Sequence, residues 1–91
     1  MTTADATVSV TLQNAQGLHA RPSALIVKTA NSFSAKVQLR IGARSADCKS
    51  IMEVMMLASP RGTELVFEAR GNDAAAAVSA LASLVAGGFG E

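Results

Sequence analysis

The sequence predicts an α+β two-layer sandwich, with helices covering one face of a four-stranded sheet. Apolar and polar residues alternate in separate short segments, a pattern typical of strands that have one face in a core and the other in water. Between and after these segments lie stretches with apolar residues at helical spacing. Because the strands keep a polar face, helices should occupy only one side of the sheet, which excludes a doubly wound parallel sheet.

The first half of the chain predicts strand, helix, strand and strand. Residues 8–12 alternate between apolar and polar side chains, and residues 14–17 form a turn. A helix should begin at about His19 or Ala20, with an apolar face that consists of Ala24, Val27 and Ala30, widened by Leu25 and Ile26. Alternation over residues 36–41 predicts a second strand, and residues 44–48 predict a third, shorter one.

The second half predicts helix, strand and helix. Residues 50–57 should form a short helix, and a turn at residues 60–62 should lead into a strand over residues 64–70. Asn72 or Asp73 is expected to cap the last helix by accepting hydrogen bonds from its free backbone N–H groups. That helix should end at Gly87 and Gly88. We expect residues 1–91 to form a single domain, because 91 residues leave no room for a second core.

Composition excludes several classes of function. The net charge is only +1, and the chain has neither a cluster of basic residues nor an aromatic motif for stacking bases, so nucleic acid is not an expected partner. No apolar stretch is long enough to span a bilayer, and the first ten residues lack the pattern of a signal peptide. We therefore expect a cytoplasmic protein with no membrane partner.

The lone cysteine, Cys48, cannot form an internal disulfide, which suits a reducing compartment. We interpret Cys48 as a small apolar side chain in a strand rather than as a reactive thiol. No second histidine or thiolate lies at ligand spacing from the one histidine, so we expect no metal site. Nothing in the sequence indicates a cofactor.

His19, the only histidine, lies where the first helix should begin, and Pro22 fits the first turn of that helix. Helix N-termini attract anions through free N–H groups and the helix dipole, and Arg21 adds a full positive charge. An imidazole with an unprotonated nitrogen can accept a phosphoryl group. The alternative is a partly buried loop histidine that only hydrogen-bonds the backbone.

Ser50 lies three residues before Glu53, the spacing of a capping box at a helix start. In such a box the serine hydroxyl accepts the N–H of Glu53, and the glutamate reaches back to the N–H of the serine. This arrangement is a complete structural explanation of Ser50. It is compatible with regulatory phosphorylation, because a phosphate at a helix N-terminus meets a favourable dipole.

The short helix after Ser50 is apolar on every side, and a helix at the edge of a small domain cannot bury its whole circumference. We expect part of it to be exposed as a docking patch that includes Ile51, Met52 and Met55. Methionine side chains adapt to several partners. The alternative is that all of these side chains belong to the core.

From residue 8 to the end, the chain resembles the histidine-containing phosphocarrier protein (HPr) family of the bacterial phosphoenolpyruvate–sugar phosphotransferase system. Gly17-Leu18-His19-Ala20-Arg21-Pro22 looks like the active-site signature of that family, and Lys49-Ser50-Ile51-Met52 looks like its regulatory serine site. The resemblance implies a fold with four antiparallel strands and three helices on one side, in the order βαββαβα. It also implies a cytoplasmic monomer that carries a phosphohistidine and is not a stand-alone catalyst.

The resemblance further implies that Enzyme I, charged from phosphoenolpyruvate, phosphorylates His19 on Nδ1 while Arg21 steadies the phosphoryl group. The group would then pass to an Enzyme IIA protein or domain. Ser50 would be the target of an HPr kinase/phosphorylase that slows transfer, and Ile51, Met52 and Met55 would form the docking patch. Glu53 stands where many members have glycine, and its charge opposes a phosphate on Ser50.

Segments 55–57 and 87–91 look closer to the nitrogen-related branch of this family, in which the relay ends in a regulatory Enzyme IIA. Two other classes of function compete with the phosphocarrier. A regulatory module that binds partners through the methionine-rich helix would not depend on His19. A free-standing enzyme would need a substrate pocket and a pair of acid–base residues, for which the sequence shows no signal.

Overall fold

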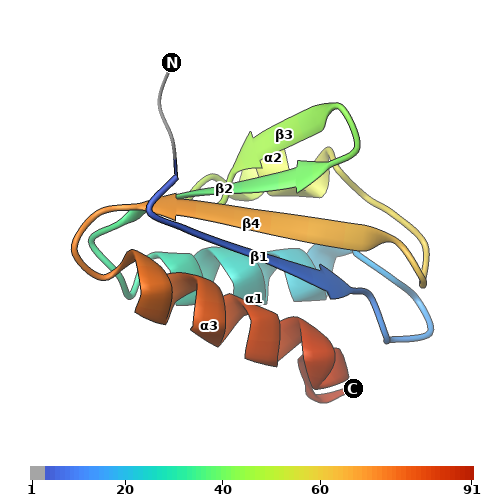
Figure 1. Ribbon diagram of the computed structural model, residues 1–91. Coiled ribbons are helices and arrows are strands. Elements are labelled where there is room, and N and C mark those ends of the chain that lie inside the picture. The colour runs from blue at the N-terminus through green and yellow to red at the C-terminus, as the bar shows by residue number, and fades with distance from the viewer. Residues whose placement is uncertain (1–3) are drawn as a thin grey trace.

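The computed structural model describes residues 4–91, and its strands and helices follow the predicted order (Figure 1). The first three residues, which belong to the segment judged not to be a signal peptide, lie outside the described part. The strands are β1 (Ala6–Thr11), β2 (Lys36–Ile41), β3 (Arg44–Asp47) and β4 (Glu64–Arg70). The helices are α1 (Ala20–Ala30), α2 (Ile51–Met55) and α3 (Ala74–Ala86).

The four strands form one sheet in the order β1-β4-β2-β3, and all neighbouring strands are antiparallel. Helices α1 and α3 lie side by side beneath the sheet, and the short α2 packs against both α1 and β3 (Figure 1). This arrangement confirms the predicted fold class. The alternation of the strands explains it, because Val37 and Leu39 of β2 are buried while Lys36, Gln38 and Arg40 face solvent.

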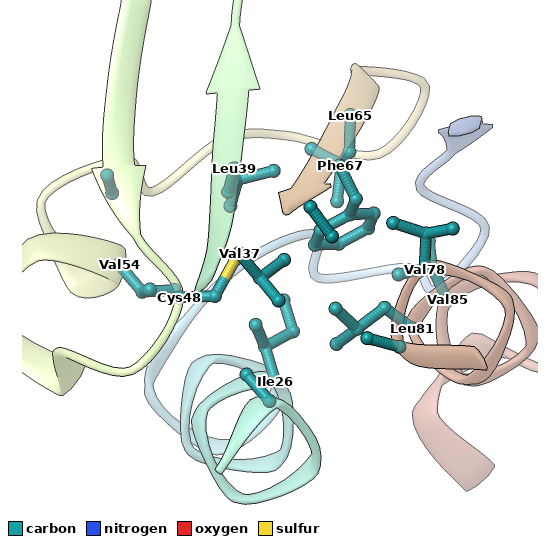
Figure 2. Packing of buried hydrophobic residues seen from close by; sticks show 14 of the residues in the cluster. Ile26, Val37, Leu39, Cys48, Val54, Leu65, Phe67, Val78, Leu81 and Val85 are labelled. Atoms are coloured by element: carbon teal, nitrogen blue, oxygen red, sulfur yellow. The ribbon is translucent and has the colours of Figure 1, made fainter. Parts of the chain in front are cut away.

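The core lies between the sheet and the two long helices (Figure 2). Phe67 of β4 is fully buried and pairs in register with Val8 of β1 and Leu39 of β2. Ile26 of α1 and Leu81 of α3 point toward it from below. Full burial of such a side chain stabilises the fold by about 3 kcal/mol. The open face of the sheet carries a surface ion pair between Arg40 and Glu68 at 2.9 Å.

The predicted inner face of α1 was partly wrong. Ala24 is exposed, and Ser23 is buried together with Ile26 and Ala30. Once α1 begins at Ala20, positions 23, 26 and 30 follow one another at helical spacing toward the core. Pattern analysis missed Ser23 because it is polar. Its hydroxyl finds no hydrogen-bond partner within residues 4–91.

The predicted cap of α3 was also wrong in its contacts. Asp73 occupies the residue before the helix, but its side chain accepts no hydrogen bond from α3. Its two carboxylate oxygens accept the backbone N–H groups of Ser34 and Ala35, each at 2.8 Å. These N–H groups belong to the connection between α1 and β2, where they have no strand partner. The hydrogen bond from Ser34, more than any other contact, holds the pKa of Asp73 below its ordinary value.

Cys48 follows β3 and is fully buried. Its backbone N–H donates a hydrogen bond to the Val37 carbonyl at 2.9 Å. Burial, reinforced by the charge of Asp47, raises the pKa of the thiol to about 12. The interpretation of Cys48 as a small buried side chain is therefore confirmed, but its placement in a strand is wrong, because β3 ends one residue earlier. Across the described residues, no helix has the length and apolar character needed to cross a membrane.

Candidate functional site

The backbone around His19 is held by strand-like pairing to a distant loop. Leu18 is buried, its N–H donates to the Ser59 carbonyl at 2.8 Å, and the Ser59 N–H donates back at 3.3 Å. His19 then takes an extended conformation (φ −137°, ψ −165°) as the residue before α1. Its carbonyl accepts the N–H of Ser23 at 2.9 Å, which is the first hydrogen bond of the helix. The predicted helix start is confirmed.

His19 and Arg21 lie on the wall of one open pocket of about 770 Å³, as predicted from their spacing. Arg21 is exposed, so it is free to reach a ligand. Arg61, from the turn before β4, and Glu91, at the end of the chain, line the same pocket. The pocket therefore has two guanidinium groups, one carboxylate and the imidazole at the N-terminus of α1. The N–H groups of Ala20 and Arg21 precede the first helical hydrogen bond and can serve an anion.

The two nitrogens of the His19 ring differ in their surroundings. Nε2 is covered and lies 3.5 Å from Oε2 of Glu91, although it makes no hydrogen bond within the described residues. The side chain as a whole is 34% exposed. Nδ1 is therefore the nitrogen on the side that an incoming group can reach.

Glu91 reaches His19 because the chain folds back after α3. Gly88, Phe89 and Gly90 all have positive φ, at 64°, 58° and 74°. For Phe89 this backbone conformation is uncommon and costs about 1–2 kcal/mol. Phe89 is nevertheless only 3% exposed, so burial of its ring offsets that cost and anchors the tail.

Sequence reasoning missed three residues of this pocket: Asn14, Arg61 and Glu91. Asn14 donates from Nδ2 to Oε1 of Glu91 at 3.1 Å, across 77 positions of sequence. No local motif connects these residues, because only the tertiary fold brings their segments together. The one available signal was the glycine pair around Phe89, which indicates a tight turn back toward the domain.

Ser50 lies apart from this pocket, as the residue before α2. Its hydroxyl accepts the N–H of Glu53 at 3.3 Å, so half of the predicted capping box is confirmed. The other half is wrong: Oε1 of Glu53 accepts the N–H of Asp47 at 3.0 Å, while the N–H of Ser50 donates to the Asp47 carbonyl. The turn over residues 48–49 connects the end of β3 to α2 and leaves the N–H of Asp47 beside the first turn of the helix, where Glu53 accepts it.

Helix α2 is shorter than predicted, and together with Met56, the residue that follows it, it exposes four apolar side chains. Met52 and Met56 are 76% and 74% exposed, and Ile51 and Met55 are partly exposed, while Val54 and Leu57 are buried. The expected exposed apolar surface is thus present, but Met56 must be added to it. We call Ile51, Met52, Met55 and Met56 the methionine patch. Among residues 4–91, no group of acidic, histidine and cysteine side chains gathers in a way that could hold a metal ion.

Comparison with known proteins identifies the family. A family model described as "PTS HPr component phosphorylation site" matches residues 6–87. This chain belongs to the HPr family. The phosphocarrier protein HPr of Cupriavidus necator is 43% identical over 81 residues, which cover 89% of this chain and 91% of the relative.

Solved HPr structures also match the fold. HPr from Thermoanaerobacter tengcongensis has a TM-score of 0.89 at 37% identity, with 94% of this chain and 97% of that chain covered. An HPr dimer from the same organism has a TM-score of 0.75 at 38% identity, covering 92% of this chain and 97% of that chain. The expectation of a monomer therefore stays a prediction.

Proposed function

We propose that this chain is a phosphocarrier of the phosphotransferase system that accepts a phosphoryl group from phospho-Enzyme I on His19 and passes it to an Enzyme IIA. Membership of the HPr family supports the phosphocarrier role. The observation that carries the assignment to His19 is its place at the N-terminus of α1, in one pocket with Arg21 and Arg61. An anion bound there meets two guanidinium groups and free helix N–H groups.

The transfer step follows from the accessible nitrogen. The lone pair of Nδ1 attacks phosphorus, and the bond from phosphorus to the donor nitrogen breaks, with its electron pair staying on the donor. Arg21 and Arg61 balance the charge of the phosphoryl oxygens, and the open pocket lets a second protein approach the adduct. The step toward Enzyme IIA reverses this sequence with a new acceptor nitrogen.

Labelling from phosphoenolpyruvate and Enzyme I tests this proposal. The wild-type protein should gain one phosphate that is labile in acid and stable in base. His19→Ala should gain none while keeping its melting temperature. A wild-type protein that stays unlabelled with active Enzyme I would contradict the proposal.

We also propose Ser50 as a site of regulatory phosphorylation by an HPr kinase/phosphorylase. Its position before α2 supports this, whereas the nearby carboxylates of Asp47 and Glu53 oppose a phosphate by charge. Mass spectrometry of protein taken from cells, which scores phosphate on His19 and Ser50 separately, tests it. Phosphate on His19 with none on Ser50 under every growth condition would contradict the serine proposal.

The methionine patch favours one alternative function, a regulatory module that acts by binding alone. A pull-down of partners with wild type and with His19→Ala separates the two, because only the module would be indifferent to the substitution. Assignment to the nitrogen-related branch, cytoplasmic location and a single domain over residues 1–91 remain part of the proposal.

A further inference from the structure

We propose that Asn14 is a positioning residue, which holds the Glu91 carboxylate against Nε2 of His19 and so directs phosphorylation to Nδ1. The inference rests on the proposed role of His19 as the phosphoryl acceptor. It extends that role to a side chain five residues before the histidine and to the end of the chain.

Asn14 is 6% exposed, which is unusual for an asparagine in a connection between a strand and a helix. Its Nδ2 donates to the Gly17 carbonyl at 2.7 Å and to Oε1 of Glu91 at 3.1 Å. Both partners are acceptors, so the amide must present its NH₂ side to them. One side chain therefore connects the loop that carries His19 to the tail that carries Glu91.

Glu91 faces the histidine with its other oxygen. Oε1 is held by Asn14, and Oε2 lies 3.5 Å from Nε2 of His19. The buried ring of Phe89 and the left-handed turn over Gly88–Gly90 keep the tail in place from the other side. The hydrogen bond from Asn14 and the buried ring of Phe89 therefore hold the Glu91 carboxylate beside His19.

A carboxylate in this position acts on Nε2 in two ways. Its charge favours a proton on Nε2, which leaves the lone pair on Nδ1. It also covers Nε2 and repels the negative oxygens of a phosphoryl donor from that side. The other charged side chains that line the pocket, Arg21 and Arg61, attract the donor instead. When the lone pair of Nδ1 attacks phosphorus, the bond from phosphorus to the donor nitrogen breaks and its electron pair stays on the donor. The proton on Nε2 stays on the ring, and the positive charge of the ring is balanced by Glu91.

Phosphoramidate, a small donor with a phosphorus–nitrogen bond, tests this inference without Enzyme I. Wild type, Asn14→Ala, Glu91→Ala and the double variant are treated with it, and NMR of the ring nitrogens gives the ratio of Nε2 to Nδ1 adduct. We expect Nδ1 adduct in the wild type and a rise of about tenfold in that ratio in each single variant. The double variant should show no larger rise, because both substitutions remove one shared contact.

Asn72→Ala is the matched control. It removes an exposed asparagine before α3, at the opposite end of that helix from Glu91 and ~20 Å away by helical rise. It should leave the ratio unchanged. If Asn14→Ala does not fold, Asn14→Asp keeps the shape of the side chain but faces Glu91 with an acceptor, and the same rise is expected.

Two results would overturn the inference. One is an unchanged ratio in folded Glu91→Ala, which would mean that the carboxylate does not direct phosphorylation, whatever the Asn14 variants do. The other is a raised ratio in Glu91→Ala with no rise in a folded Asn14 variant, which would mean that the carboxylate acts without Asn14. Failure of the proposed function looks different, because the wild type would then take phosphate from phosphoramidate at Nδ1 but none from phospho-Enzyme I.

Discussion

The backbones of Gly17 and Ser59 lie in such close contact that no side chain fits at position 17. Gly17 has a positive φ of 68°, and a Cβ there would run into the Ser59 carbonyl oxygen and lie 2.8 Å from the Pro60 carbonyl carbon. This approach permits the paired hydrogen bonds between Leu18 and Ser59. The position of His19, one residue further on, therefore depends on glycine at position 17.

Gly17→Ala should destabilise the protein by at least about 3 kcal/mol, because the strained φ adds to a backbone clash that cannot relax. Gly62→Ala is the matched control, since Gly62 also has a positive φ, of 91°, but nothing within 4 Å of a Cβ. It should cost about 1 kcal/mol. Urea unfolding measures both, and equal losses would show that the contact with Ser59 is not responsible.

Arg21→Ala should slow phosphotransfer from phospho-Enzyme I by about 10²-fold, because a guanidinium facing the phosphoryl oxygens is lost. The melting temperature should not change, since Arg21 is exposed. Arg21→Lys should recover only part of the rate, because lysine keeps the positive charge but cannot form the bidentate hydrogen bonds of a guanidinium group. Rapid-quench kinetics measures the three rates. A rate for Arg21→Ala equal to that of wild type would refute the charge argument at the start of α1.

If phospho-Enzyme I docks on the methionine patch, as the resemblance to the family implies, Met52→Glu should weaken that docking without loss of stability. Met52 is among the most exposed apolar side chains, so a charge there meets water in the free protein and is buried only in the complex. We expect KM for transfer to rise about tenfold with kcat little changed. Ala76→Glu, on the exposed side of α3, is the control and should behave as wild type.

Asp73→Asn should change the dependence of stability on pH. Because hydrogen bonds from Ser34 and Ala35 lower the pKa of Asp73 in the folded state, its contribution is fully present above the pKa of the unfolded chain. That contribution is lost as pH falls through the lower, folded-state pKa. The free energy of unfolding should therefore fall more steeply with acid in the wild type than in Asp73→Asn. Parallel curves over this range would exclude the role of the carboxylate.

The thiol of Cys48 should resist alkylation in the native state, since burial raises its pKa to about 12. Iodoacetamide at neutral pH should label it only at the rate at which the protein opens, and fully in denaturant. Mass spectrometry follows the reaction. Rapid labelling of the native protein would contradict the buried position.

Local patterns were enough to predict the elements and the first site residue. Alternation in β2 and β4, and the helix start marked by His19 and Pro22, depend on neighbours within a few residues. The inner face of α1 was harder, because a polar residue, Ser23, takes a core position that apolar spacing assigns to Ala24. The carboxylate of Asp73 was likewise expected to accept N–H groups of α3, next to it in sequence, but it accepts the N–H of Ser34, 39 residues away.

The sequence by itself determined the fold class, the element order, His19 with Arg21 at a helix start, and Ser50 as a cap. These features follow from periodicity and short-range hydrogen bonding, which depend only on residues close together in the sequence. Only the tertiary structure decided the strand order, the approach of Gly17 to Ser59, and the meeting of Asn14, Arg61 and Glu91 around His19. Those contacts join segments tens of residues apart, and their existence depends on how the whole chain packs around one core.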